Sequence, residues 1–283
     1  MTKQELAELN DLVYLLLKQN QTVSHIFASH SDELNICRRT LYNYIDAGVL
    51  SARNIDLPRK VKYKKRKKEE TVQRNDYSYR KDRTYKDFEN YLSLHAEKEV
   101  VEMDTVKGSN QAGKCLLTMM FRSSKFMLIF LLDRCTSEEV IRVFDYLTET
   151  LGENLFRKTF PVILTDNGSE FKASERLEKT TDGKRRTHIF YCDPHMSNQK
   201  SRIEKNHEYI RYIIPKGRSM YKLTEQNALD MTNHINSVAR DTLNGHTPFD
   251  MAKILLNEKV LEALELTPVP ADSVCLHPTL FHI

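Results

Sequence analysis

The chain has 283 residues, of which 40% are hydrophobic and 29% are charged, and these proportions are ordinary for a soluble globular protein. This length suffices for one large domain and one small domain. The longest apolar run, Phe126 to Leu132, is far too short to span a bilayer, and the first residues lack the apolar core of a secretory signal. We therefore expect a cytoplasmic protein that acts without a membrane.

The charge is unevenly distributed. The formal net charge is only +4, yet residues 59–68 carry eight of the 43 Lys and Arg residues, leaving 35 against 39 acidic residues elsewhere. Such a run favours the phosphate backbone of nucleic acids, because binding releases counterions. A solvated linker is the alternative. The DNA contacts predicted in this run are Arg59, Lys60, Lys62, Lys64, Lys65, Arg66 and Lys67.

The five cysteines are odd in number, scattered, and without a C-x-x-C pair. Free thiols are therefore expected, in place of disulfides or a structural zinc site. His25 and His30 have no downstream cysteine pair that would complete a zinc module, so we do not expect them to bind metal.

The amino-terminal residues predict three short helices, at residues 4–19, 22–30 and 37–46. Two short helices across a polar turn resemble a helix-turn-helix whose second helix enters a major groove. A small helical bundle with a polar face is the alternative. The predicted DNA contacts of the third helix are Arg38, Arg39, Tyr42 and Asn43.

A helix at residues 84–95 leads into a segment that predicts strands. Residues 99–106 alternate apolar and polar side chains at period two, and two apolar runs, 115–121 and 126–132, are joined by the predicted hairpin turn Arg122-Ser-Ser-Lys125. Thr136 begins a capping box and a helix. The later elements are strands at Pro161–Thr165 and His188–Cys192 and helices from about Asn198 to Ile213 and from Thr224 to Asn244. This order predicts a mixed sheet flanked by helices.

Asp166 ends the fourth predicted strand, and Asn167-Gly168 turns the chain directly after it. Its carboxylate either caps that turn or lies at a strand end where α/β proteins place their chemistry. Glu170 is expected to cap the helix that follows.

Three carboxylates stand out by position: Asp104 on the first strand, Asp166, and Glu204 on the helix after the fifth strand. We expect the first and fourth strands to be adjacent and the helix to pack beside them. Clustered carboxylates repel one another, so they need divalent cations, and hard oxygen ligands select magnesium or manganese. A two-metal site of this kind suits in-line attack on a phosphodiester. Glu208, one turn after Glu204, is the alternative third ligand.

The motif Thr165-Asp-Asn-Gly-Ser-Glu-Phe171, with Asp193-Pro194 ahead of Glu204 and Arg211-Tyr-Ile-Ile-Pro-Lys-Gly217 behind it, resembles the catalytic domain of bacterial insertion-sequence transposases of the IS-thirty type. The resemblance runs from about Glu99 through Thr247-Pro248-Phe249. It implies a ribonuclease-H-like fold and two Mg²⁺ ions, with Mn²⁺ as a substitute. The Asp-Asp-Glu triad that it implies is Asp104, Asp166 and Glu204, and Arg211 matches a basic residue that would reach DNA phosphate.

The resemblance also implies a function. Such a transposase cleaves DNA at the ends of its element and transfers the 3′-hydroxyl strand into target DNA. The implied partners are the terminal inverted repeats and the target DNA, bound by a homodimer or larger assembly at the nucleoid. A non-catalytic DNA-binding regulator or a truncated, inactive transposase is the alternative. A retroviral-type integrase is disfavoured, because the expected histidine–cysteine zinc module is absent.

The chain departs from the family pattern at Ile203, where a polar residue is usual, and at Glu208, where glycine is usual. It is also shorter at its amino end than typical members, so we expect it to lack an upstream DNA-binding helical region. His195 and His207 are expected to support the site without binding metal. Other basic residues near Glu204 line either a DNA groove or a solvated helix face: Lys200, Arg202, Lys205 and Lys216.

The predicted fold class is α/β, with a ribonuclease-H-like catalytic core preceded by a small all-α region. We expect four segments: a helix-turn-helix-like DNA-binding region at 1–50, a basic linker at 51–83, the integrase catalytic core at 84–250 and a C-terminal tail at 251–283.

Overall fold

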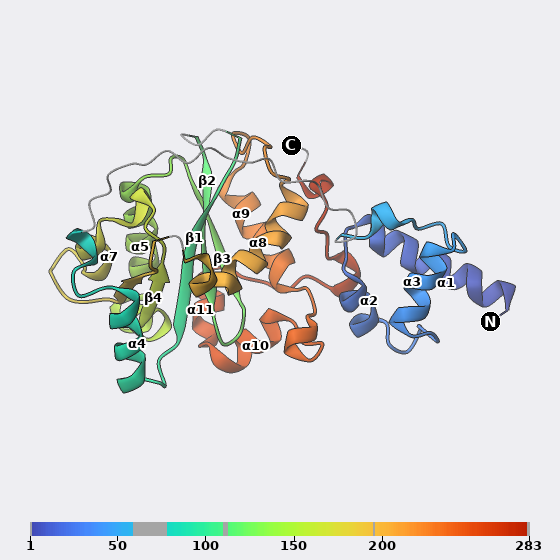
Figure 1. The fold of residues 1–283 in the computed structure, drawn as a ribbon, viewed down its shortest axis with the longest axis horizontal. Helices are drawn as coiled ribbons and strands as arrows, with labels where there is room; N and C mark the ends of the chain where they lie inside the picture. Colours follow the sequence, from blue (N-terminus) through green and yellow to red (C-terminus); the bar gives the residue numbers. More distant parts are fainter. Residues whose placement is uncertain (1, 59–77, 110–112, 195, 282–283) are drawn as a thin grey trace.

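The computed structural model describes residues 2–58, 78–109, 113–194 and 196–281. Over these ranges a small helical region, residues 2–58, lies beside a larger α/β domain (Figure 1). No helix in these ranges is long and apolar enough to cross a membrane.

The larger domain is built on a mixed five-stranded sheet. Its strands are β1 (Val100–Lys107), β2 (Cys115–Phe121), β3 (Met127–Leu132), β4 (Val162–Thr165) and β5 (His188–Tyr191). They lie in the order β3-β2-β1-β4-β5, in which β1, β2 and β3 pair antiparallel, whereas β4 pairs parallel with both β1 and β5. This is the strand order of a ribonuclease-H-like fold, so the predicted fold class is confirmed. The predicted hairpin turn between β2 and β3 is also confirmed.

Alternating side chains of the sheet contribute to two hydrophobic cores. Val101 and Met103 of β1 belong to one core, together with residues of α5 (Ser137–Leu151) and α6 (Glu153–Thr159). Val106 belongs to the other core, with residues of α8 (Ser201–Ile213) and α9 (Glu225–Asn236). The period-two pattern of β1 therefore produces a sheet covered by helices on both faces. Smaller helices complete the cover: α4 (Tyr85–Leu94), whose Phe88 packs on Phe190 of β5, and α7 (Ser174–Glu178).

The edge strand β3 is covered by side chains of α9. Asn236 accepts the backbone N–H of Met127 at 2.9 Å and donates to its carbonyl oxygen at 2.7 Å. Thr232 accepts the N–H of Ile129 at 3.2 Å. These bonds satisfy backbone groups that an edge strand otherwise offers to another chain.

The helix predicted over Thr224–Asn244 is shorter than expected. It ends at Asn236, and the chain then turns through Asn244 and Gly245, whose φ angles are +54° and +86°. The cap residue Ser237 already leaves helical geometry, with φ −89° and ψ 1°, and the positive φ angles farther along keep the α-helix from resuming. Buried Val238 extended the apolar pattern beyond the true end, because burial outside a helix produces the same sequence signal as a helical apolar face.

The amino-terminal region contains α1 (Lys3–Lys18), α2 (Val23–Ser29) and α3 (Arg38–Asp46), which confirms the three predicted helices. Thr2 and Thr22 cap the first two helices by accepting backbone N–H groups. The three helices share a hydrophobic core of their own.

The segment predicted as a C-terminal tail is folded. It includes most of α10 (Pro248–Leu255) and all of α11 (Glu258–Ala263), so the boundary placed at residue 250 falls inside a helix. Farther along, the N–H of Leu276 donates to the carbonyl oxygen of Gln19 at 2.9 Å. The Gln21 side chain donates to carbonyl oxygens of the same segment. The segment therefore connects the helical region to the larger domain (Figure 1).

Candidate active site

The parallel pairing of β1 with β4 brings Asp104 and Asp166 together, as expected from the predicted adjacency of these strands. Asp104 lies within β1, and Asp166 directly follows Thr165 at the end of β4. One ammonium group links the two carboxylates: Lys200 Nζ lies 3.0 Å from Asp104 Oδ1 and 2.9 Å from Asp166 Oδ2.

The sequence predicted Lys200 only as a residue of a DNA groove or of a solvated helix face. Its central position between the two aspartates was missed. It ends the 3-10 turn Ser197–Lys200 that precedes α8, and its side chain is 5% exposed. Burial alone lowers the pKa of Lys200, but the carboxylates of Asp104 and Asp166 outweigh it, so the pKa lies above its usual value. In the sequence, only its position four residues before Glu204 indicated that Lys200 lies near the site.

Asp104 is the more enclosed of the two aspartates. Burial raises its pKa to about 6, the positive charge of Lys200 opposes the shift, and the negative charge of Asp166 adds to it. The backbone N–H of Thr105 donates to Asp104 Oδ1 at 2.8 Å. A buried carboxylate with a like charge beside it requires a cation, and the Lys200 ammonium supplies one here.

Asp166 combines both roles weighed from the sequence. Its Oδ1 accepts the N–H of Gly168 at 2.9 Å, which is the turn-capping bond, while Oδ2 faces Lys200. A Cβ atom on Gly168 would lie 2.8 Å from Glu170 Oε2 and 3.0 Å from Asp166 Oδ1. Glycine is therefore needed where the turn passes between the two carboxylates.

The expectation that Glu170 caps the following helix is wrong. Glu170 is buried, and its Oε1 accepts the Thr105 hydroxyl at 2.6 Å and the Cys135 thiol at 3.2 Å, with Lys107 Nζ 3.6 Å away. It therefore links the loop after β4 to β1 beside Asp104. No local pattern in the sequence indicates this link, because the partners of Glu170 come from β1 and from the segment after β3.

Glu204 lies exposed on α8, one turn after Lys200. Within the described ranges no three His, Cys, Asp or Glu residues are grouped closely enough to hold a metal ion. The structure thus unites two members of the predicted triad and leaves Glu204 outside that group. Its role as the third ligand stays a prediction, as does the alternative of Glu208, which is also exposed.

His207 packs behind Asp104. Thr118 donates its hydroxyl proton to the carbonyl oxygen of Asp104 at 3.0 Å, so its oxygen accepts from His207 Nε2 at 2.8 Å. The other ring nitrogen, Nδ1, lies 4.0 Å from Asp104 Oδ2. Burial lowers the pKa of His207 to about 3, and the charges of Lys200 and Arg211 add to the shift. His207 is therefore neutral at pH 7 and positions β1 through Thr118. The other supporting candidate, His195, lies outside the described residues.

Carboxylate oxygens suit a divalent cation such as Mg²⁺, and the Lys200 ammonium shows that this pair accommodates a positive charge within 3.0 Å. Asp104 and Asp166 therefore fit the metal that the resemblance implies, provided that Lys200 leaves the carboxylates.

The structure describes five of the twelve predicted DNA contacts: Arg38, Arg39, Tyr42, Asn43 and Arg211. On α3, Arg38 donates to Asp241 of the larger domain at 2.7 Å, and Tyr42 lines a cavity that α8 also lines. Arg39 and Asn43 are exposed. Arg211 donates to the carbonyl oxygen of Lys107 at 3.0 Å. The remaining predicted contacts lie outside the described residues: Arg59, Lys60, Lys62, Lys64, Lys65, Arg66 and Lys67.

Sequence comparisons identify relatives. The chain is 25% identical over 214 residues to the probable transposase for insertion-like sequence element IS1161 of Streptococcus salivarius, covering 75% of this chain and 57% of that protein. It is 27% identical over 158 residues to the transposase for insertion sequence element IS4351 of Bacteroides fragilis, covering 56% and 45%. This chain is homologous to insertion-sequence transposases. It spans about half the length of these relatives, and no family model matches it.

Among solved structures, the simian T-cell lymphotropic virus intasome in complex with PP2A regulatory subunit B56 gamma is similar to this chain. The match has a TM-score of 0.42 and 18% identity, and it covers 54% of each chain.

Proposed function

We propose that the protein is a DNA transposase of the IS-thirty type. It cleaves phosphodiester bonds at the ends of its element and transfers the freed 3′-hydroxyl strand into target DNA. The observation that carries this proposal is the meeting of Asp104 and Asp166 across the parallel β1–β4 pair, around a single cationic group. The transposase relatives supply the reaction class.

In this proposal Asp104, Asp166 and Glu204 hold Mg²⁺, or Mn²⁺ in its place, with two ions in the active state. The ions supply activation of the attacking oxygen and stabilisation of the leaving oxygen in an in-line displacement. The chain's own residues orient the ligands: Thr105 and Gly168 fix the two aspartates through N–H bonds, and Glu170 secures the loop after β4. Glu204 joins them when α8 adjusts and Lys200 moves away.

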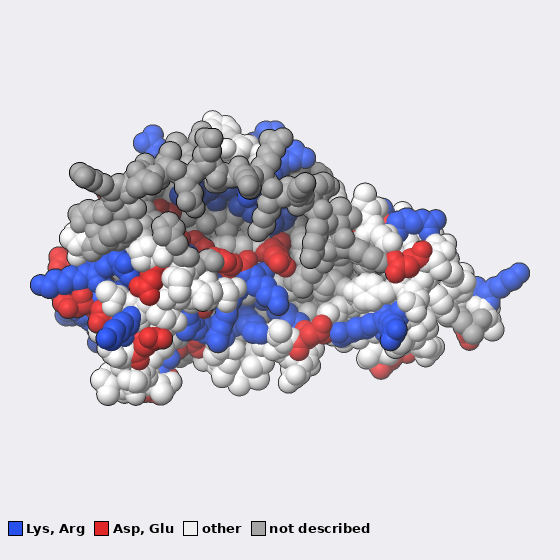
Figure 2. Space-filling view, in the orientation of Figure 1, with Lys and Arg blue, Asp and Glu red and all other residues white. Residues whose placement is uncertain are grey.

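DNA binding by the helical region, the basic segment and Arg211 is part of the same proposal. On the face seen in Figure 2, acidic side chains gather near the middle of the larger domain beside a group of Lys and Arg side chains. Basic side chains beside a carboxylate centre suit a substrate whose backbone is anionic and whose reaction needs bound cations. The proposed partners are terminal inverted repeats and target DNA, held by a homodimer or larger assembly at the nucleoid.

The experiment uses purified protein, labelled terminal inverted repeats, a target duplex and Mg²⁺. Wild type should release strand-transfer product, and Asp166→Asn should release none, because it keeps the side-chain shape and removes the charge. Glu149→Gln, an exposed carboxylate on α5, is the matched control and should behave as wild type. The proposal fails if wild type and Asp166→Asn release equal product, or if both bind DNA and neither releases any.

One observation favours a second function. Lys200 satisfies both aspartates while Glu204 remains outside the cluster, an arrangement that suits a DNA-binding regulator which has kept the fold without the reaction. Calorimetric titration with Mn²⁺ separates the two functions. A regulator should bind DNA and show no Mn²⁺ binding that depends on Asp166.

A further inference from the structure

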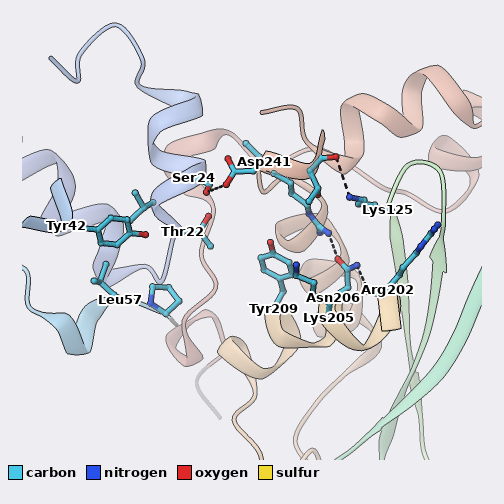
Figure 3. Close-up of a pocket in the computed structure, with 15 residues that line it drawn as sticks. Thr22, Ser24, Tyr42, Leu57, Lys125, Arg202, Lys205, Asn206, Tyr209 and Asp241 are labelled. Atoms are coloured by element: carbon cyan, nitrogen blue, oxygen red, sulfur yellow. Dashed lines mark hydrogen bonds between the residues drawn. The ribbon is translucent and has the colours of Figure 1, made fainter. Parts of the chain in front are cut away.

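A second site lies between the helical region and the larger domain. It is a cavity of about 670 Å³ that α2, α3 and the segment Leu57-Pro58 line from one side, and the β2–β3 turn, α8 and residues 239–242 line from the other (Figure 3). None of the proposed metal ligands lines it. Its opposite walls differ in chemistry.

The wall from the larger domain is cationic. Lys125, Arg202 and Lys205 line it, and within the described part of the chain none of the three forms an ion pair with a carboxylate. Burial lowers the pKa of Lys125, and the charges of Arg240, Arg202 and Lys205 lower it further. These side chains are therefore close enough to repel one another, and an anion between them would relieve that repulsion.

The only acidic side chain among the described lining residues already has partners. Asp241 accepts from Arg38 at 2.7 Å. It also accepts from the Ser24 hydroxyl at 2.6 Å (Figure 3). It therefore links the two walls through partners in the helical region and does not compensate the charges of Lys125, Arg202 and Lys205 on its own wall.

The wall from the helical region is largely apolar. Tyr42, which is 40% exposed, projects toward the cavity from α3, and Leu57 lies on the same side (Figure 3). Val23 of α2 also lines the cavity. An aromatic ring opposite a group of cations matches the two parts of a nucleotide, since a base stacks on aromatic faces and a phosphate pairs with Lys and Arg.

We propose that this cavity binds one unpaired nucleotide of a DNA strand, with its phosphate on Lys125, Arg202 and Lys205 and its base against Tyr42. The inference rests on the proposed function, because that function brings DNA to the neighbouring carboxylates. Lys200 precedes Lys205 by five residues, about 7.5 Å at the rise of a helix. The bound nucleotide therefore lies close in the strand to the phosphodiester at the carboxylate site.

The test measures binding of a fluorescent single-stranded oligothymidylate, and of the same strand in a duplex, by anisotropy at several salt concentrations. The full chain is used as wild type and as Arg202→Gln/Lys205→Gln. Both side chains are exposed, so the variant should fold. The matched control is Arg157→Gln/Lys158→Gln, an exposed basic pair on α6.

The cavity variant should bind the single strand about ten-fold more weakly, and the slope of log K against log salt should fall by about 0.7, because the contact with one phosphate is lost. The control should match wild type. Tyr42→Ala should weaken binding of the single strand about five-fold or more and binding of the duplex less, whereas the exposed Tyr221→Ala should change neither.

The proposed nucleotide site would be overturned if Arg202→Gln/Lys205→Gln bound the single strand with wild-type affinity and with the wild-type salt slope. Equal losses for strand and duplex would overturn it as well, because they would show contact with backbone alone. These results are distinguishable from failure of the proposed function. If strand transfer is absent while strand binding still depends on Arg202, Lys205 and Tyr42, the transposase reaction is lost and the nucleotide site stands.

Discussion

The carboxylate site and the interdomain cavity lie a few residues apart along the start of α8, yet they treat positive charge in opposite ways. Lys200 is buried and lies within 3.0 Å of two carboxylates. Arg202 and Lys205 are exposed at the cavity and, among the described residues, form no ion pair. The difference arises because side chains at successive positions along a helix point in different directions, so residues close in sequence face different surroundings.

The two sites therefore have opposite charge. One site is anionic, and the tethered ammonium group of Lys200 satisfies it. The other is cationic and has a position for an anion. The first is built inside the sheet, whereas the second is formed between two regions joined by an exposed ion pair, Arg38–Asp241.

The largest expected effect comes from Glu204→Gln, which tests whether the carboxylate site is a triad. Strand transfer should fall about 10³-fold, equivalent to about 4 kcal/mol of transition-state stabilisation, because a metal ligand is lost. Glu208→Gln, the matched control one turn later, should stay within about two-fold of wild type. Single-turnover strand transfer measures both. The reverse ranking would make Glu208 the third ligand.

Lys200→Met should separate the tethered cation from the metal. In metal-free buffer the free energy of unfolding should fall by about 2 kcal/mol, a value discounted because Asp166 is 41% exposed. Added Mn²⁺ should stabilise the variant more than wild type, because no ammonium competes for the carboxylates. Thermal unfolding with and without Mn²⁺ measures this, with Lys158→Met as the control. An equal Mn²⁺-induced shift in both proteins would contradict competition.

His207 should make stability depend on pH. Its pKa is about 3 in the folded protein and near 6.5 when unfolded, so the unfolded state binds more protons between these values. The contribution of neutral His207 to the free energy of unfolding is therefore fully present above pH 6.5. It is lost as the pH falls toward 3, by up to about 1.4 kcal/mol per pH unit. Asp104, with its pKa raised to about 6, has the opposite slope between its unfolded and folded values.

The measurement is urea unfolding in metal-free buffer at pH 7 and pH 5. His207→Gln keeps a donor for Thr118 and should be destabilised less by acid than wild type is. The exposed His246→Gln is the control and should follow the wild-type curve. Parallel curves for His207→Gln and wild type would show that His207 already titrates near its ordinary value.

The smallest effect should come from Arg38→Gln, which removes the ion pair between the two walls of the cavity. Both side chains are exposed, so stability should change by no more than about 0.5 kcal/mol. Proteolysis between the two regions should nevertheless become faster, because their contact is weakened. Arg39→Gln on the same helix should leave both quantities unchanged. A loss of stability as large as that of Lys200→Met would erase the contrast between the two sites.

Local patterns in the sequence determined the elements of this protein and the pairing that centres its site. Period-two alternation predicted β1, helical periodicity predicted α1 to α3, and the strand-end Asp166 was visible because Asn167-Gly168 follows a buried apolar run. These patterns are local, and the folded structure agrees with them because each helix or strand buries its own apolar face.

Tertiary structure alone decided which other groups join the two aspartates. Lys200 reaches both aspartates because a 3-10 turn redirects the chain before α8, and Glu170 is buried against Thr105 of β1 and Cys135 of the segment after β3. α9 ends at Asn236, where Ser237 leaves helical geometry, although the apolar pattern continues. Partners far apart in sequence leave no periodic signal, so the sequence indicated where the carboxylates lie, and only the packing of β1, β4 and α8 determined which cation they hold.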